Sequence, residues 1–427
     1  MTQSSLAIPP QKVAVSTSVR WKLVMPTLLV IWILGMVDKI GVAIIATNKG
    51  FLQQMNLVGH PALVGLLVTV MLFAYGIGFP VWGVLVDKIG PKKCTIFGLI
   101  LWALSTAMAA MAQSFSILLI SRIILGLAEA YLWPTSNSLT ARWFPLQERG
   151  RAKSIWINGI NIGLAISGFV VNGLIGPFHW RGVFWFLTII AVIICLPMAI
   201  LFLKDNPAED RRVSASELEY IRSEQLTVTD HGDKTKSKAK GMGTSSFWLA
   251  VIVNIANVFG VFGLATWFPS YLTGAKHFSH ATASNYIALA FGLCIIMTTL
   301  VGALTDKTKR KATWGAVGFL ISMVVLILIG FVGSALYDTL LLVIAIICIQ
   351  GITTLVNHGI MHSFTVTEHI GRDNGVMVGI SNLLAAFGPT IMGALIGLGG
   401  YNLSFGFLAV CFLVGTIGHV VLAKQGY

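Results

Sequence analysis

The sequence contains few charged residues for its length. Only 11% of its 427 residues are Asp, Glu, Lys or Arg, whereas 56% are hydrophobic, and soluble domains are on average about 25% charged. The apolar residues form repeated runs of about 20 residues, which is the length needed to cross the hydrocarbon core of a bilayer. The composition therefore excludes an ordinary soluble protein and predicts an all-α membrane protein with many spans.

Close cysteine pairs and cofactor motifs are also lacking. The five cysteines lie in or beside apolar runs, at Cys94, Cys195, Cys294, Cys348 and Cys411. This pattern excludes a disulfide framework and offers no metal site. His358 and His362 have the spacing of joint metal ligands, but no acid lies in the same predicted span and Cys348 is ten residues away, so pore lining or helix packing is favoured. With no P-loop and no nucleophile–base pair, we expect neither an enzyme nor a cofactor.

The apolar runs predict twelve transmembrane helices in two groups of six. A hydrophilic segment at 204–245, with a short helix near 214–221, separates a six-helix bundle at 1–203 from a second one at 246–427. We treat this segment as a cytoplasmic linker. The predicted spans are 24–46, 61–86, 95–113, 117–140, 151–175, 184–203, 246–272, 283–304, 313–333, 340–366, 374–398 and 404–423.

The positive charges are distributed unequally between the two sides of the predicted membrane. The formal net charge is +13, yet only Lys49, Arg181 and Lys276 fall in connections on one side. Basic residues concentrate in cytoplasmic loops of membrane proteins, so we predict that both termini are cytoplasmic. This bias also accounts for the net charge without nucleic-acid binding. The polar first 19 residues show no cleavable signal.

Apart from Arg151 and Lys153 at the cytoplasmic start of the fifth span, four Asp, Glu, Lys or Arg residues fall inside the predicted spans, two of each sign: Asp38, Lys39, Arg122 and Glu129. Arg122 and Glu129 are seven residues apart, so they share a helix face about 10 Å apart along the axis. Ionisable groups at bilayer depth are costly and usually mark an ion or substrate path. The alternative is that they form ion pairs that only hold helices together.

A motif of the form Gly-x-Leu-x-Asp-Lys occurs once in each predicted half. It ends span two as Gly83-Val-Leu-Val-Asp87-Lys88 and span eight as Gly302-Ala-Leu-Thr-Asp306-Lys307. Its recurrence at the same topological place indicates duplicated halves. Parallel repeats of this kind place the substrate site near the membrane midplane, between the halves.

The repeated motif resembles the loop signature of the major facilitator superfamily. Asp38-Lys39 and the pattern Arg122-(x)3-Gly126-(x)2-Glu129-Ala130-(x)3-Pro134 are similar to those of its anion:cation symporter family. The similarity continues in residues 143–152, 267–272 and 382–389. It implies an alternating-access transporter in which the repeated motif gates one access state through Gly83, Asp87, Lys88, Asp306 and Lys307.

The resemblance and the chemistry together suggest roles for the intramembrane residues. Arg122 can grip a carboxylate through two parallel hydrogen bonds, and Lys39 could supply a second contact or hold Asp38. We expect proton coupling by Asp38 and Glu129, because loss of water favours a protonated carboxyl group and a nearby cation opposes it. The expected substrate-binding residues are Lys39, Tyr75, Arg122, Asn161 and Asn382.

The chain departs from the family pattern at three polar positions. Lys39 replaces the usual arginine, Ile160 stands where sugar-acid permeases tend to have glutamine, and Val378 stands where a second asparagine often lies. We expect proton-coupled uptake of an organic carboxylate, first a hexonate or hexuronate and next an aromatic or short hydroxy-dicarboxylic acid. Efflux of drugs or organic anions, phosphate-ester exchange and a membrane sensor remain alternatives.

The expected setting is the inner membrane of a bacterium, because the first outer loop is short, unlike that of animal vesicular relatives. The expected partners are a small organic anion, protons and the lipid bilayer. We expect the protein to function as a monomer.

Overall fold

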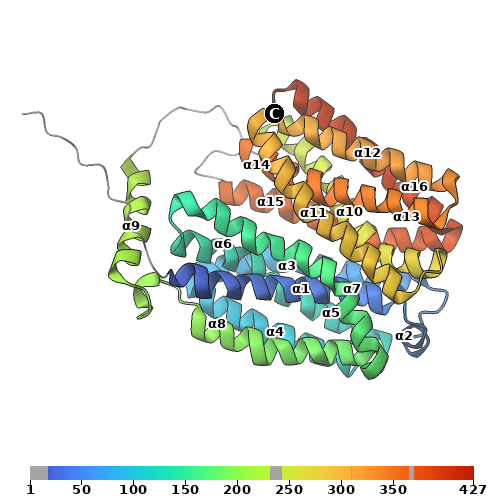
Figure 1. The fold of residues 1–427 in the computed structure, drawn as a ribbon, viewed down its shortest axis with the longest axis horizontal. Coiled ribbons are helices and arrows are strands. Elements are labelled where there is room, and N and C mark those ends of the chain that lie inside the picture. Colours follow the sequence, from blue (N-terminus) through green and yellow to red (C-terminus); the bar gives the residue numbers. More distant parts are fainter. Residues whose placement is uncertain (1–17, 231–242, 309, 365–369) are drawn as a thin grey trace, which may run out of the picture.

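The computed structural model describes residues 18–230, 243–308, 310–364 and 370–427, and every regular element in these ranges is a helix (Figure 1). Long apolar helices suit a membrane because they satisfy all their backbone hydrogen bonds internally. The all-α architecture predicted from the sequence is thus confirmed for the described residues.

The N-terminal half contains eight α-helices. Pro26, Pro61 and Pro91 stand in the first turns of three of them, where the missing N–H costs no hydrogen bond. The helices are α1 (Met25–Ile45), α2 (Lys49–Gln54), α3 (Pro61–Ile89), α4 (Pro91–Ala110), α5 (Phe115–Glu129), α6 (Leu132–Trp143), α7 (Leu146–Ile190) and α8 (Leu196–Phe202), with π-helical turns at Arg20–Val24 and Ala191–Cys195.

A 3-10 turn (Pro207–Glu209) and helix α9 (Ala215–Asp230) follow the N-terminal half. The C-terminal half then contains a second series of helices, joined in two places by π-helical turns. Its elements are α10 (Ser245–Ser270), η5 (Tyr271–Ala275), α11 (His280–Thr308), α12 (Lys311–Val332), α13 (Ala335–Ile346), η6 (Ile347–Thr353), α14 (Thr354–Phe364), α15 (Ile370–Ala385) and α16 (Gly388–Lys424).

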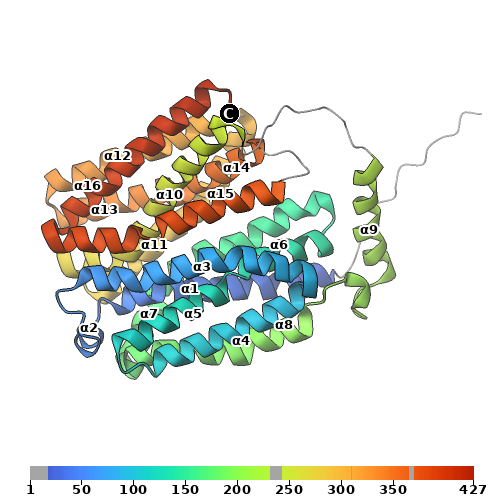
Figure 2. The ribbon, with the colours of Figure 1, turned by 180° about the vertical axis from the view of Figure 1, so that it is seen from behind.

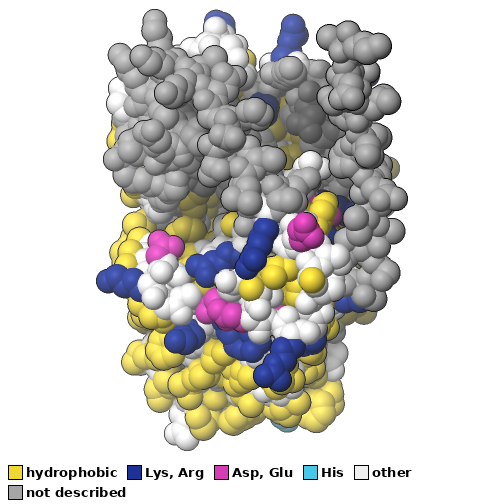
Figure 3. Space-filling view, turned by 90° about the vertical axis from the view of Figure 1, so that its left-hand side faces the viewer, with side chains coloured by type: hydrophobic (Ala, Val, Ile, Leu, Met, Phe, Trp, Pro, Cys, Tyr) yellow, Lys and Arg dark blue, Asp and Glu magenta, His cyan; other side chains and the backbone are white. Residues whose placement is uncertain are grey.

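The two halves form two bundles that lie side by side, with α9 across one end of the molecule (Figures 1 and 2). Figure 3 views this end and shows acidic and basic side chains gathered on it beside an apolar flank. Asp87, Arg142 and Asp205 were predicted to be cytoplasmic, and they belong to this end. Arg142 donates to the carbonyl oxygen of Asp205 at 3.4 Å. We refer to it as the α9 end.

Ten stretches of the described chain are long and apolar enough to cross a membrane. Two of them far exceed the roughly 20 residues that a span needs: Gln147–Phe202 has 56 residues and Val376–Lys424 has 49. The first is broken by non-helical backbone at His179 and the second at Gly399 and Gly400. Both breaks fall in connections predicted from the sequence, at 176–183 and 399–403. The exact count of twelve stays a prediction, as does the location of the termini.

Hydrogen bonds between the halves gather at mid-depth and at the end opposite α9. Asn172 donates to Ser284 at 3.0 Å, Thr390 donates to Thr69 at 2.8 Å, and Thr47 lies 3.4 Å from His280. Asn161 and Gln350 make a further contact near the middle. Among the residues that the structure describes, no such bond joins the halves at the α9 end. The halves therefore meet most closely at the end away from α9.

Helix α9 is attached to the N-terminal half through a buried cluster of charges. Arg20 contacts Glu217 of α9 at 2.7 Å and Glu148 of α7 at 3.0 Å, and Glu217 is fully buried. Before α9, Arg212 donates two hydrogen bonds to Asp210, and they hold the pKa of that carboxyl below its ordinary value. The helix predicted near 214–221 is present and longer, and it is docked on a bundle instead of being surrounded by solvent.

Candidate functional site

The four predicted intramembrane charges meet in the interior of the N-terminal half as two ion pairs. Nη2 of Arg122 lies 3.3 Å from Oδ1 of Asp38, and Nζ of Lys39 lies 3.3 Å from Oε2 of Glu129. All four residues are at most 5% exposed. Both separations exceed the roughly 2.7–2.9 Å of a strong charge-assisted hydrogen bond. The neighbours Asp38 and Lys39 on α1 thus each reach a different residue of α5.

Asp38 is held by two donors from different helices. In addition to Arg122, the indole Nε1 of Trp102 on α4 donates to Oδ2 of Asp38 at 2.5 Å. Each carboxylate oxygen therefore has its own partner. Hydrogen bonds of this kind stabilise the ionised form and fix the position of the group. The contacts of Asp38 are those of an anchored carboxylate.

Glu129 is equally buried but is not anchored in this way. Neither of its carboxylate oxygens accepts a hydrogen bond from any described residue, and Lys39 is the one described cation within 4 Å of it. Glu129 is the last residue of α5. The helix is interrupted there because Pro134 cannot donate to the carbonyl oxygen of Ala130 and its ring crowds that group. The carboxylate thus lies at a break in the span.

Lys39 lies between Glu129 and an aromatic ring. Its Nζ is 4.3 Å from the centre of the Tyr75 ring on α3, a cation–π distance. Gly126 makes the arrangement possible, since a Cβ there would overlap the carbonyl oxygen of Met71. Close contact between α3 and α5 brings Tyr75, Lys39 and Glu129 together.

Arg122 points into the same half, toward its outer helices. Its guanidinium lies 5.1 Å from the ring of Phe184 in α7, and its buried Nε donates to no described residue. The face shared by Arg122 and Glu129 was the basis for assigning them to one site. The structure joins them only indirectly, through Asp38 and Lys39 on α1.

The other predicted contacts are dispersed. Asn161 is 5% exposed and accepts a hydrogen bond from Gln350 of the other half at 3.3 Å. Asn382 is half-buried and donates to the carbonyl oxygen of Val378 on its own helix at 2.9 Å. Asn161 therefore faces the interface between the halves, and Asn382 satisfies its own backbone.

The described charged side chains of the predicted gating motif are exposed in this structure. Asp87 and Lys88 are exposed, a side chain added at Gly83 would meet no atom within 4 Å, and Asp87 has no partner among the described residues. Lys307 is exposed as well. The side chains of Asp306, His358 and His362 lie outside the part of the chain that is described. The gating role of the motif stays a prediction.

Asp205 caps the helix that follows the first copy of the repeated motif. Its Oδ1 accepts a hydrogen bond from the backbone nitrogen of Lys92 at 2.7 Å, at the start of α4. Asp205 also lies against Gly90, whose φ of +88° favours glycine. The sequence signal for this role was weak, because Asp205 lies over 100 residues from the helix that it caps.

One acid that the sequence placed outside the predicted spans, Asp338, is also buried within an apolar stretch. Asp338 lies in the first turn of α13, is 1% exposed, and pairs with Lys276 at 2.5 Å. The tenth span was predicted to begin at residue 340, whereas the stretch begins at Ala335. Because Lys276 was placed in a loop, its pairing with Asp338 could not be foreseen.

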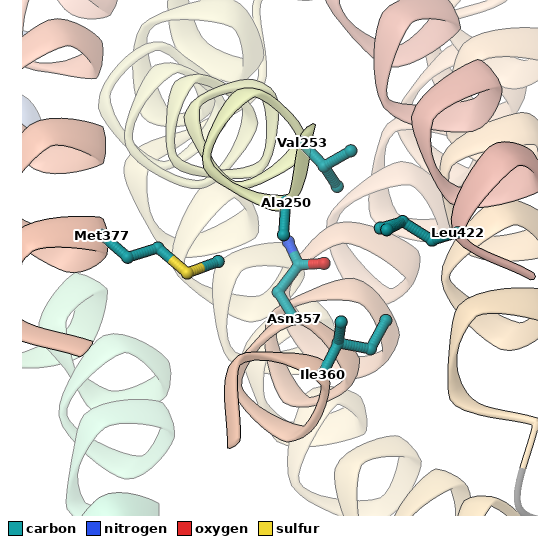
Figure 4. A pocket seen from close by; sticks show the side chains of 6 residues that line it. All are labelled: Ala250, Val253, Asn357, Ile360, Met377 and Leu422. Carbon is teal, nitrogen blue, oxygen red and sulfur yellow. The ribbon is translucent and has the colours of Figure 1, made fainter. Parts of the chain in front are cut away.

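A packing gap too small to hold a water molecule lies inside the C-terminal half, at the α10, α14, α15 and α16 helices (Figure 4). The amide of Asn357 points among apolar side chains there, and its Nδ2 has no described hydrogen-bond partner. None of the lining residues is charged. An anion would be buried there without a counter-charge, so this gap is a poor anion site.

Known proteins resemble this chain over most of its length. A family model described as "Major Facilitator Superfamily" matches residues 21–377. A probable anion transporter 3, chloroplastic, of rice (Oryza sativa subsp. japonica) is 28% identical over 64% of this chain, which spans only about half (53%) of the rice protein. A hexuronate transporter of Bacillus subtilis (strain 168) is 24% identical over 87% of this chain and 88% of its own length.

A solved structure has the same fold. It is a bacterial homologue of the human lysosomal transporter Spinster, in an inward-facing and unoccupied conformation. It has a TM-score of 0.75 and 17% identity, and covers 96% of this chain and 98% of its own. The relatives agree with the resemblance to anion:cation symporters found in the sequence. The chain therefore belongs to the major facilitator superfamily, whose members are membrane transporters and not enzymes.

Proposed function

We propose that this protein takes up a small organic carboxylate together with protons, by alternating access. The observation that carries the proposal is the state of Glu129. This carboxylate is 1% exposed, accepts no hydrogen bond from the described residues, and is compensated by a single lysine at 3.3 Å. A group held only by one cation can lose that cation to a competing anion.

The coupling follows from the exchange of partners at Lys39. When the carboxylate of the substrate takes the ammonium group of Lys39, Glu129 is left buried without a counter-charge. An isolated buried charge is very costly, so Glu129 binds a proton as the substrate enters. When the substrate leaves, Lys39 returns to Glu129 and the proton is released. Anion and proton therefore cross together.

The two cations have different roles in this proposal. Lys39 is the substrate contact, because its present partner Glu129 is not otherwise anchored, whereas Arg122 is bound to Asp38. Asp38 is held by both Arg122 and Trp102, so proton transfer at Asp38 would need a larger rearrangement. In this proposal the clamp function passes from Arg122 to Lys39, and Arg122 holds Asp38 in place. Tyr75 aligns Lys39.

The direction of opening follows from the contacts between the halves. If the α9 end faces the cytoplasm, as the charge bias predicts, the described hydrogen bonds between the halves lie at mid-depth and toward the outside. The inter-half bonds Asn172–Ser284 and Thr69–Thr390 then form the outer closure. The membrane would be the inner membrane of a bacterium.

The substrate class is supported by the site and by the relatives. One lysine and a tyrosine ring provide one fixed cation for one carboxylate. A relative of matching length is a hexuronate transporter, so sugar acids are the first group to test, followed by aromatic and short hydroxy-dicarboxylic acids.

Uptake by the purified protein in liposomes tests the coupling. The wild type should accumulate the substrate identified by a thermal-shift screen of organic acids when an inward proton gradient is imposed. Glu129→Gln keeps the shape of the side chain but cannot exchange a proton. This variant should still exchange labelled for unlabelled substrate, yet should not respond to the gradient. Accumulation by Glu129→Gln that still follows the proton gradient would sink the proposal.

A further inference from the structure

Gln350 is a polar residue at the interface that no sequence motif singled out. It lies in η6, a π-helical turn inside the span that joins α13 to α14. Such turns are rare and are frequent at functional sites. Its Nε2 donates to Oδ1 of Asn161 in the N-terminal half at 3.3 Å. Its Oε1 is buried and accepts no hydrogen bond from the described residues.

The segment that carries Gln350 is held in place by a polar network. Asn257 of α10 accepts from Thr353 at 2.5 Å and donates to Thr354 at 3.1 Å. These bonds fix the end of η6 one turn from Gln350. The Gln350 side chain also borders a small cavity with about 10 Å³ of space for water, and it is the single polar side chain among the residues that line it. A positioned amide in apolar surroundings is typical of a specificity contact.

Asn161 and Glu129 lie at the same depth along α1. A Cβ added at Gly35 would lie 3.7 Å from Oε1 of Glu129. The glycines on either side of Asn161, Gly159 and Gly163, approach Trp32 and Met36 of α1. Both groups are therefore level with residues 32–36 of α1. A ligand bound at Lys39 would meet the amide pair by extending across the interior at this level.

We propose that Gln350, together with Asn161, binds a hydroxyl group of the transported anion. The inference rests on the proposed function, in which Lys39 holds the carboxylate. A hydroxyl group is both donor and acceptor, so it can donate to the free Oε1 of Gln350 and accept from the amide nitrogen of Asn161. Its entry replaces the Asn161–Gln350 bond with two bonds to the substrate.

Gln350 also accounts for a departure from the family pattern. Sugar-acid permeases of the resembling family tend to have a glutamine where this chain has Ile160. Gln350 supplies an amide from the opposite half. Because the amides are neutral, a second carboxylate at this place would be buried without a cation. The substrate class is therefore a hydroxylated monocarboxylate, and dicarboxylates and unhydroxylated acids are disfavoured.

Binding of matched acids to the purified full chain tests the inference. Glucuronate, gluconate and glycerate are compared by calorimetry with hexanoate and propionate, which lack the hydroxyl groups. We expect the wild type to prefer the hydroxylated acids. Gln350→Leu should reduce that preference about 10-fold, the factor of one hydrogen bond, by weakening the hydroxylated acids only. Gln350→Asn, which keeps the amide, should retain part of the preference.

Asn172→Ala is the matched control, because it also removes a hydrogen bond between the halves, at a place remote from Lys39. It should leave the preference unchanged. If Gln350→Leu leaves the preference intact, or if Asn172→Ala reduces it equally, Gln350 is only a contact between the halves and the inference is wrong. If the wild type binds none of these acids, or binds them independently of Lys39, the proposed function fails and the inference fails with it.

Discussion

The two halves of this protein share a repeated motif but differ in their interiors. The N-terminal half buries four charges that form two ion pairs, Lys39–Glu129 and Arg122–Asp38. At the corresponding depth the C-terminal half has neutral amides and hydroxyls, such as Asn257, Thr353 and Gln350. Its ion pair, Lys276–Asp338, lies at the end of the bundle, with Asp338 in the first turn of α13.

Our two proposals assign different functions to the two halves. Charges in a low-dielectric interior can exchange partners and protons, whereas neutral amides can recognise hydroxyl groups without adding charge. One half then provides binding of the carboxylate and proton coupling, and the other provides selectivity. The predictions below test whether the functions are separated between the halves in this way.

The largest effect is expected at Lys39. Lys39→Met should weaken binding of the carboxylate about 100-fold or more, because loss of a buried charge partner costs roughly 2–5 kcal/mol. Arg122→Gln should weaken binding much less, because Arg122 contacts Asp38 and Phe184 in this structure. Calorimetric titration of both variants with the same acid measures the difference.

Lys39→Arg is the control for Lys39→Met, because it restores a positive charge at this position and should recover much of the affinity. The double variant Lys39→Met/Glu129→Gln should be well folded, since it leaves no unpaired charge, and yet should not bind. If Arg122→Gln has the larger effect on binding, the clamp is Arg122 and our assignment is wrong.

The second pair is expected to affect the stability of the protein. Asp38→Asn leaves Arg122 buried without a counter-charge and should destabilise the protein by about 3–5 kcal/mol, and Arg122→Gln should do the same for the opposite reason. The double variant Asp38→Asn/Arg122→Gln removes both charges and should recover most of the loss. Denaturant titration of the four proteins in one detergent gives the coupling free energy.

Lys276→Met is the comparison from the C-terminal half. Lys276 is partly exposed, so water can reach the site and the loss should be smaller than for Asp38→Asn. Additive effects of Asp38→Asn and Arg122→Gln would contradict the pairing seen here.

The sequence alone predicted which charged residues lie in the interior of the N-terminal half. Apolar runs revealed the helices, and the cost of charge in lipid singled out Asp38, Lys39, Arg122 and Glu129. It did not reveal their pairing, because Arg122 and Glu129 share a face of one span and the choice of partner depends on how α1 packs against α5. Asp38 and Lys39, which are adjacent on α1, determine the pairing.

The C-terminal half was less predictable for a physical reason. Gln350 is a neutral residue in an apolar run and carries no cost large enough to mark it. Its role depends on the π-helical turn and on Asn161, nearly 200 residues away. Asp338 escaped notice because it lies in the first turn of its helix, where sequence-based boundaries are least reliable.

The central claim is that substrate displaces Glu129 from Lys39 and that Glu129 then binds a proton. Calorimetric titration of substrate into the protein in two buffers of different ionisation enthalpy counts the protons taken up on binding. The account predicts about one proton per substrate for the wild type, none for Glu129→Gln, and an unchanged value for Gln350→Leu. Binding by the wild type without proton uptake, or equal uptake by Glu129→Gln, would contradict it.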